Sequence, residues 1–277
     1  MESTFEKLKK LYDNDTEMPL PSRKCEKCGN CFGPCCPSVG QNYDNKENVP
    51  KLLIISLDNA GGDCHGVNEI TESLLDPKKN AYLIKKKKKT FNPHWRETLS
   101  IANIILNPFI KENHLIEDKI KRGRNYFSHT NSAKCKQQIK NKNSSPYSFF
   151  YNCRSIVLKD VEAFAPDIIV TQGKNATLWM KSMKPEEIEI KKIPIKATIE
   201  KGKNKGEFKQ TWKVIEVNGR KILVIPMAHP TSRKAKWPDG KSRGGLWYAQ
   251  KQLVSEKENI AKIKEIIEKI KENIKLE

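Results

Sequence analysis

Three short apolar runs and one more polar, strand-like segment are spread along the chain, and each is followed by polar or small residues. Runs of this length without alternation are typical of strands that are buried on both faces of a sheet. A glycine or a polar cluster follows each run, which indicates a loop where the strand ends. The four predicted strands are 51–57 ("KLLIISL"), 125–131 ("NYFSHTN"), 166–173 ("PDIIVTQG") and 221–226 ("KILVIP").

Stretches with helical spacing separate the predicted strands. They are 4–13, 94–110, 148–165, 174–183 and 245–277, the last with a stripe of isoleucines. Strands that alternate with helices form α/β domains with parallel sheets. We therefore expect a three-layer α/β/α sandwich around a central, mostly parallel, four-stranded sheet.

The same pattern divides the chain into three parts. Residues 1–50 hold a short helix and an arm rich in cysteine, proline and glycine. Residues 51–253 form the α/β core, in which 186–218 alternates like a β-hairpin with "KGKNKG" at its turn. Residues 254–277 are expected to be an amphipathic helix that packs on this core.

Charge adds a class of partner to this picture. The chain has 277 residues, a formal net charge of +19 and 37% hydrophobic residues. Such a charge predicts a polyanionic partner, with nucleic acid first and an acidic membrane surface second, although a lysine-rich solvated surface gives the same composition. The sequence has no apolar run long enough for a membrane span and begins with a charged segment, so we expect a cytoplasmic monomer that binds DNA and no membrane.

The eight cysteines point to metal or catalysis rather than to disulfides in such a compartment. Five of them lie in "CEKCGNCFGPCCP", where the first four have C-x2-C-x2-C-x3-C spacing. This spacing is close to that of ferredoxins that bind a four-iron cluster, and paired C-x2-C also binds zinc, so spacing alone leaves the metal open. Cys135 and Cys153 are isolated in the sequence, and on that ground alone the common interpretation is that each is an ordinary core cysteine.

Polar residues follow three of the predicted strands, in "SLDNAGG", "SHTNSAKC" and "IPMAHPTSRKAKW". Ligands of parallel sheets bind beyond the carboxyl ends of the strands. These three strand ends are therefore the predicted site.

Three segments together resemble the uracil-DNA glycosylase superfamily, most closely its iron–sulfur family 4. They are "TNSAKC" (130–135), "NCRSIVLKDVEAFAPDIIVTQGKNA" (152–176) and "ILVIPMAHPT" (222–231). They are similar to that family's T-N-x-x-K-C segment, its N-C-R helix with the strand and G-K-x-A turn that follow, and its strand with a His-Pro loop. The resemblance covers roughly residues 25–65 and 125–235, in the family's order.

This resemblance implies an enzyme that flips a base out of DNA and hydrolyses its N-glycosidic bond. It also implies a structural 4Fe-4S cluster held by Cys25, Cys28, Cys135 and Cys153. A local ferredoxin-like set of ligands, or a replacement of one arm cysteine by Cys31, Cys35 or Cys36, stays open.

The resemblance gives three residues roles in the reaction. His229 would stabilise the oxyanion that develops on the leaving base. Asn131 would pair with the edge of a pyrimidine, because an amide both donates and accepts. Asp58, followed by Asn59, stands in the first catalytic motif and would orient water and stabilise the cationic sugar. The structural alternatives are a turn histidine, a strand-end asparagine and a turn aspartate.

The first motif departs from the family. The family pattern G-E-x-P-G is replaced here by "SLDNA" (56–60), and the stacking phenylalanine of P-F-x-G has only Phe91, His94 and Trp95 as substitutes. Small residues such as Ala60 and Gly61 would widen the pocket, and the segment from Asn59 to His65 would set a new specificity. We expect a bulkier substituted pyrimidine, such as those of modified phage DNA, as an alternative to uracil, with a role in repair or in phage defence.

The loop after His229 would contact DNA. Arg233, Lys234 and Lys236 can reach phosphates and Trp237 can wedge or stack, although a plain basic loop is the alternative. Two other functions remain open. One is a non-catalytic iron–sulfur protein that binds DNA, and the other is an enzyme with a Cys64/His65 thiolate.

Overall fold

The computed structural model describes most of the core and part of the arm. The described residues are 2–15, 18, 31–32, 36–44, 49–58, 67–70, 93–110, 126–134, 136–137, 146–183, 191–199, 206–230 and 243–272. The elements, in chain order, are α1 (Thr4–Asn14), β1 (Cys31–Phe32), β2 (Ser38–Gly40), β3 (Leu52–Asp58), β4 (Asn68–Ile70), α3 (Pro93–Leu106), η2 (Asn107–Phe109), β5 (Phe127–Ala133), β6 (Lys136–Gln137), α4 (Tyr147–Asn152), α5 (Arg154–Phe164), β7 (Ile168–Gln172), η3 (Lys174–Ser182), β8 (Lys191–Ile199), β9 (Gly206–Val217), β10 (Arg220–Met227), α6 (Arg243–Ser255) and α7 (Lys257–Lys271).

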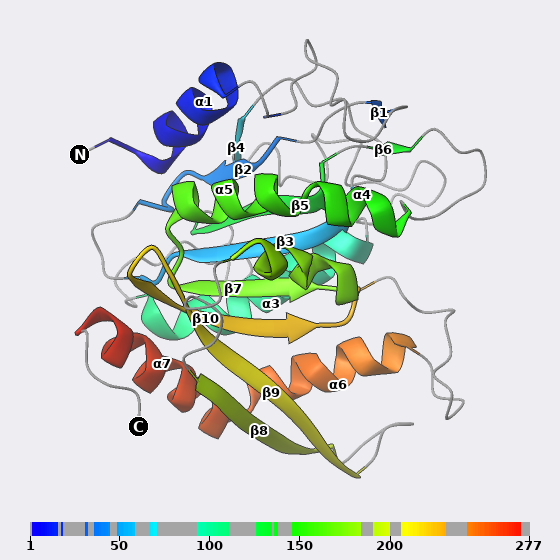
Figure 1. Ribbon diagram of the computed structural model, residues 1–277. Coiled ribbons are helices and arrows are strands. Elements are labelled where there is room, and N and C mark those ends of the chain that lie inside the picture. The colour runs from blue at the N-terminus through cyan, green and yellow to red at the C-terminus, as the bar shows by residue number, and fades with distance from the viewer. Residues whose placement is uncertain are drawn as a thin grey trace.

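The central sheet is mixed and has eight strands in the order β4-β2-β5-β3-β7-β10-β9-β8 (Figure 1). The prediction of a four-stranded, mostly parallel sheet is therefore wrong. The four predicted strands are β5, β3, β7 and β10, and they do pair in parallel with one another. The hairpin adds β9 antiparallel to β10, and the arm adds β2 antiparallel to β5. Both additions continue the hydrogen-bonding edges that four strands alone would leave open.

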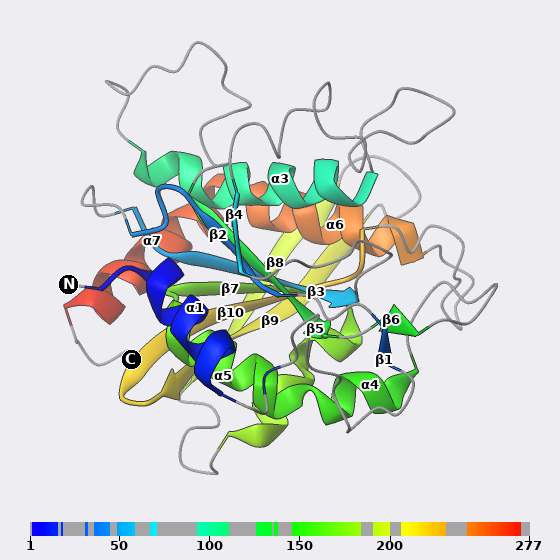
Figure 2. The ribbon, with the colours of Figure 1, turned by 90° about the horizontal axis from the view of Figure 1, so that it is seen from above.

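Helices cover both faces of this sheet (Figure 2). On one face α3, α6 and α7 bury a cluster that includes Ile54, Val170 and Trp247. On the other face α1, α5 and η3 bury a second cluster that includes Ile55, Val161 and Trp179. The α/β class with helices on both sides of the sheet is thus confirmed.

Two of the predicted helices are interrupted. The helix expected over 148–165 is divided at Cys153 into α4 and α5. The long C-terminal helix is divided at Glu256, whose backbone is extended, into α6 and α7. The Asn259 side chain donates to the carbonyl of Leu253 at 2.8 Å across this break, so a carbonyl at the end of α6 keeps a partner. None of the described helices combines the length and apolarity that a membrane span requires.

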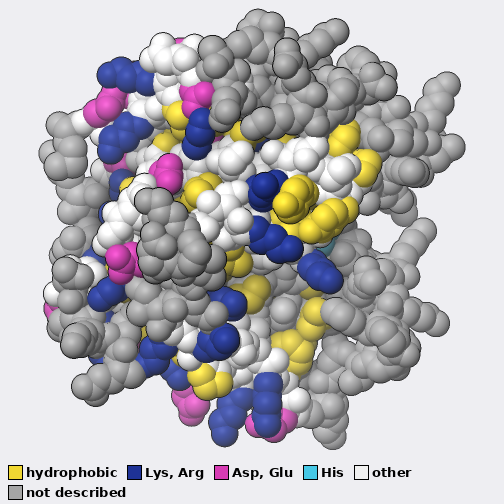
Figure 3. Space-filling view, viewed as in Figure 1, with side chains coloured by type: hydrophobic (Ala, Val, Ile, Leu, Met, Phe, Trp, Pro, Cys, Tyr) yellow, Lys and Arg dark blue, Asp and Glu magenta, His cyan; other side chains and the backbone are white. Residues whose placement is uncertain are grey.

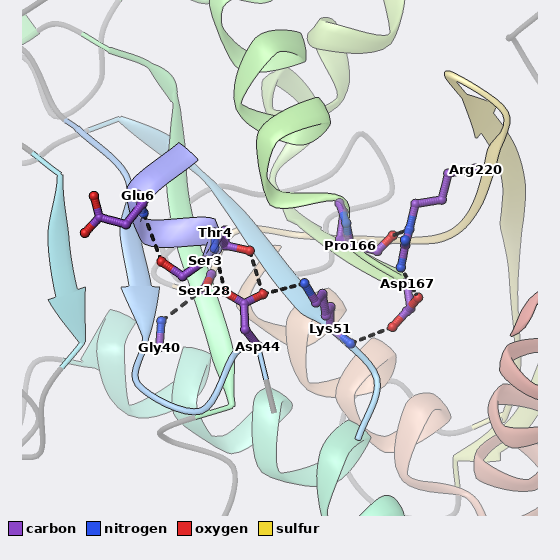
Figure 4. Close-up of polar contacts among 10 residues, drawn as sticks. All are labelled: Ser3, Thr4, Glu6, Gly40, Asp44, Lys51, Ser128, Pro166, Asp167 and Arg220. Atoms are coloured by element: carbon purple, nitrogen blue, oxygen red, sulfur yellow. Dashed lines mark hydrogen bonds and ion pairs between the residues drawn. The ribbon is translucent and has the colours of Figure 1, made fainter. Parts of the chain in front are cut away.

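Polar contacts tie α1 to the amino ends of β3 and β7 (Figure 4). The Asp44 carboxylate accepts from the backbone and hydroxyl of Thr4 at 2.6 and 2.7 Å and pairs with Lys51. Burial raises the pKa of Asp44, but the bonds from Lys51 and Thr4 outweigh it and hold the pKa below its ordinary value. Asp167 accepts from the Lys51 backbone at 2.8 Å and from Arg220 at 2.6 Å. This end of the sheet is therefore held by ion pairs, and the opposite end carries the candidate site.

Candidate functional site

Polar side chains from neighbouring strands converge where the carboxyl ends of the sheet meet the first turns of α3. Ser56, His129 and Gln172 come from β3, β5 and β7. Each of them lies two residues after a member of the hydrophobic cluster under α3. Because side chains alternate along a strand, each therefore points to the α3 face. His229 follows β10 by two residues. Four parallel strands thus deliver one polar residue each to the same edge.

The Ser56 hydroxyl is the centre of a buried hydrogen-bond network. It donates to Gln172 Oε1 at 2.8 Å and lies 2.8 Å from His129 Nε2 and 3.3 Å from His94 Nε2. Because its single proton goes to Gln172, the Ser56 oxygen accepts from His129, which places the proton of that ring on Nε2. Gln172 Nε2 donates in turn to Thr98 Oγ1 on α3 at 3.0 Å. This network fixes the ends of β3 and β7 against α3.

Aromatic rings lie over this network. The rings of His94 and His229 are stacked, with centroids 5.0 Å apart and an angle of 15° between their planes. Trp95 lies 5.0 Å from His129 in a tilted arrangement. The stack holds His229, which leaves the sheet on an irregular segment, in a defined plane. Such a wall of flat rings suits a planar ligand.

Burial keeps His94 and His129 neutral near pH 7. Desolvation is the main cause that lowers the pKa of His129 to about 3, with the nearby Lys134 as the second cause. Desolvation also brings the pKa of His94 well below its ordinary value, and His229 and His129 add to this effect. Neutral rings can donate from one nitrogen and accept at the other, which a cationic ring cannot do.

Three of the predicted site residues lie at this edge. Asp58 ends β3 and pairs in register with Ala133 of β5. Asn131 lies within β5 rather than at its end, because the strand continues to Ala133, and it is buried on the same face as His129. His229 stacks on His94 as described. The backbone therefore brings the three residues to neighbouring strand ends.

The other predicted site residues lie outside the described residues. They are Asn59, Ala60, Gly61, His65, Arg233, Lys234, Lys236 and Trp237, together with Cys64 and Phe91.

Sequence reasoning missed Gln172, His129 and Thr98. Gln172 ends the third predicted strand in "VTQG", the one strand whose end was not selected, and the rule that selected the ends of the other three applied to it as well. His129 is a polar residue inside a predicted strand, two positions from Asn131, which signals a role beyond packing. His94 and Trp95 were expected near the site as substitutes for a stacking phenylalanine, and both contact its rings.

Two of the cysteines have described positions near the segment that holds Cys135. Cys153 is buried at the junction of α4 and α5, and its Sγ lies 3.4 Å from the backbone nitrogen of Lys134, the neighbour of Cys135. The pairing of β1 with β6 sets Cys31 opposite Gln137, two residues after Cys135. Within the described part of the chain no three metal-binding side chains are grouped for a metal ion, and Cys25, Cys28 and Cys135 lie outside it.

A buried ion pair supports the same corner. Lys134 and Asp160 are fully buried and bonded to each other. Asp160 also accepts from Tyr12 at 3.0 Å and from Thr130 at 2.8 Å, so each carboxylate oxygen has a partner. The pair joins β5, α5 and α1 beneath the site.

No protein-family model matches this chain, and a comparison with curated proteins finds no relative. The function is therefore argued from the site itself.

Proposed function

We propose that the protein is a DNA glycosylase that removes a modified or damaged pyrimidine and leaves an abasic site. One observation carries the proposal: Asp58 at the end of β3, Asn131 near the end of β5 and His229 two residues after β10 lie toward the same edge of the sheet. Asn131 and His229 come from two of the three resembling segments, and Asp58 comes from the divergent first motif. The central parallel strands, with helices on both faces, are also in keeping with a uracil-DNA glycosylase-like core.

The reaction adds water across the bond between the sugar and the base. The bond from C1′ to the base nitrogen breaks, the electron pair leaves with the base, and hydroxide from water bonds to C1′ while its proton goes to the base. His229 donates a hydrogen bond to the pyrimidine oxygen on which the negative charge develops. Asp58 orients the water and stabilises the positive charge on the sugar. Asn131 reads the edge of the base with its amide.

The departure from the family in the first motif supports a substituted pyrimidine as substrate. Ser56 occupies the first position of that motif and is turned into the network of Gln172 and His129 instead of toward a ligand. The rings of His94 and Trp95 stand near His229, where a flipped base would need a stacking partner. We therefore propose that the substrate is uracil or a bulkier substituted pyrimidine, such as one from modified phage DNA. The corresponding biological role is DNA repair or defence against phage.

A 4Fe-4S cluster would be held by Cys153 and Cys135 together with two cysteines of the arm. The resemblance assigns Cys25 and Cys28, and the pairing of β1 with β6 supports Cys31 as a replacement for one of them. When bound, such a cluster supplies a structural link between the arm and the core. Iron and acid-labile sulfide in the purified protein measure its presence.

The experiment is a count of abasic sites on duplexes that differ in one base, which is uracil, thymine or a substituted pyrimidine. We expect release from the substituted duplex and loss of at least about a hundredfold in rate in His229→Ala, since an oxyanion donor contributes this much. Asp58→Asn should lose activity as well. His114→Ala is the matched control, because His114 lies in none of the three resembling segments.

Release of uracil without any action on substituted pyrimidines would contradict the altered specificity. If every duplex stays intact while the protein still binds DNA, the protein is a DNA-binding protein without glycosylase activity.

A further inference from the structure

Two tyrosines on α4 are exposed side by side. Tyr147 is 54% exposed and Tyr151 is 40% exposed, although most aromatic side chains of the described residues are buried. Their rings are stacked, with centroids 6.3 Å apart and an angle of 24° between the planes. The spacing of four residues places both on one face of the helix. The result is a flat aromatic surface directed to solvent.

An arginine continues this surface. The Arg154 guanidinium lies 3.8 Å from the centroid of the Tyr151 ring. Arg154 Nη1 also donates to the Tyr151 carbonyl at 2.7 Å, which fixes the plane of the guanidinium over the ring. A planar cation held on an aromatic face is ordered before any ligand arrives, so little side-chain entropy is left to lose on binding.

The surroundings are cationic. The 3-10 helix η3 packs against α4 through Leu178, Phe149 and Phe150, and it exposes Lys174 and Lys181. Neither α4 nor η3 contains an acidic residue. Figure 3 shows hydrophobic side chains beside lysine and arginine side chains over these two elements. The surface therefore favours a ligand that is flat, apolar in its plane and negatively charged.

This surface lies close to the candidate site. Phe149 and Phe150 of α4 contact Ala133, the last residue of β5, and Leu57 of β3 packs against the same cluster. The carboxyl ends of β3 and β5 also carry Asp58 and Asn131. The surface on α4 therefore lies at the same edge of the sheet as the candidate site, on the face opposite α3 (Figure 2).

We propose that Tyr147, Tyr151 and Arg154 form a stacking platform for unpaired bases of single-stranded DNA, with Lys174 and Lys181 on its phosphates. Bases stack on aromatic and guanidinium planes regardless of sequence, and a cationic border attracts the backbone. A protein partner is disfavoured, because the platform offers no exposed aliphatic anchor among its described residues. The position of the platform beside a catalytic edge rests on the proposed function, but its binding of single strands does not.

The test uses the full chain and three fluorescent probes that are free of any substrate base. The probes are a single-stranded oligothymidine, an abasic oligomer of the same length and charge, and a duplex. We expect Tyr151→Ala to weaken binding of oligothymidine about tenfold, because one base loses the aromatic ring on which it stacks. The same substitution should leave binding of the abasic oligomer unchanged. Arg154→Lys keeps the charge and should still weaken binding of oligothymidine, since lysine cannot stack as a plane.

Tyr248→Ala is the matched control, because Tyr248 is 47% exposed on α6, away from α4. It should bind all three probes as the parent protein does. Equal losses for oligothymidine and the abasic oligomer would reduce the platform to a phosphate contact and overturn the proposal, as would an unchanged affinity in Tyr151→Ala. Neither result depends on base release, so failure of the glycosylase proposal would not be confused with failure of this one.

Discussion

His129 owes its position to three residues that lie far from it in the sequence. Its Nε2 donates to Ser56 on β3, Ser56 donates to Gln172 on β7, and Trp95 covers the ring. A ring held in this way has one tautomer and one orientation. It can therefore support the neighbouring Asn131 without a charge of its own at neutral pH.

The low pKa of His129 makes the protein sensitive to acid. Burial lowers this pKa to about 3 in the folded protein, whereas an unfolded chain binds the proton near pH 6.5. The unfolded state thus holds more protons between these values, and stability falls as the pH falls through this window. We expect the free energy of unfolding to drop by about 2 kcal/mol for this group between pH 7.5 and pH 5. Urea unfolding at the two pH values measures the change.

The matched variant for this prediction is His129→Gln. It loses the titrating group, so its stability should change less with pH than that of the parent protein. An equal drop in both proteins would show that other groups cause the acid sensitivity.

At the residue scale, the sequence predicts which residues carry functional groups, but it does not predict which side chains they bond to. His229 and Asn131 were found through their motifs, because each sits at a fixed distance from a predicted strand. The bond between Ser56 and Gln172 joins residues 116 positions apart and exists only because β3 lies beside β7. Strand order is a property of the folded sheet, which the local pattern does not encode.

At the scale of elements, β5 and α5 are joined by the buried pair of Lys134 and Asp160. Both side chains have no exposed area, and Thr130 and Tyr12 complete the bonds of the carboxylate. An isolated buried charge costs far more than a buried pair. The pair therefore defines how the end of β5 meets α5, next to Cys153.

Asp160→Asn leaves the Lys134 charge buried without its counter-ion. We expect it to lower the free energy of unfolding by about 3–5 kcal/mol, as for other buried pairs that lose one partner. The double variant Lys134→Met, Asp160→Leu removes both charges and should recover a large part of this loss. Chemical denaturation of the three proteins provides the comparison.

A pair on α7 supplies the control. Lys269 and Glu265 are bonded at 2.8 Å but remain accessible to water. Glu265→Gln should therefore leave the free energy of unfolding nearly unchanged, because water screens an exposed pair. A similarly small effect for Asp160→Asn would mean that water reaches Lys134 and that the pair is not structural.

Sequence patterns predict long buried elements better than short or broken ones. The cores of β3, β7 and β10 are continuous apolar runs, and all three were predicted. The strands β2 and β4 have three residues each, too few to show a period. No proline or glycine marks the breaks at Cys153 and Glu256.

At the scale of the whole molecule, the hairpin of β8 and β9 places pairs of lysines directly opposite each other on neighbouring strands. Lys192 lies opposite Lys213, and Lys196 lies opposite Lys209, because the intervening residues of β8 turn into the core beneath. Like charges directly opposite each other on a sheet destabilise it. Glu207, 3.3 Å from Lys209, offsets only part of this repulsion. A phosphate backbone that approaches this face would reduce the repulsion between Lys196 and Lys209 further.

The hairpin also reaches toward the candidate site. Gln210 of β9 donates to the carbonyl of Pro226, close to the end of β10 from which His229 follows. With the net charge of +19, this placement predicts that duplex DNA at the site also contacts Lys196 and Lys209.

Two opposite effects are therefore expected of Lys196→Gln combined with Lys209→Gln. Binding of duplex DNA should weaken, and its dependence on salt should become shallower by one to two counterions, about 0.9 for each phosphate contact that is lost. Stability should meanwhile rise by a few tenths of a kcal/mol, because the cross-strand repulsion is removed.

Lys9→Gln is the control, because Lys9 lies on α1, far from the hairpin (Figure 1), and it should change neither the salt slope nor the affinity. A parent affinity that stays flat from low to moderate salt would contradict phosphate contacts altogether, and an unchanged slope in the double variant would exclude the hairpin from them. The opposite signs matter because a variant that simply unfolds would lose stability along with binding.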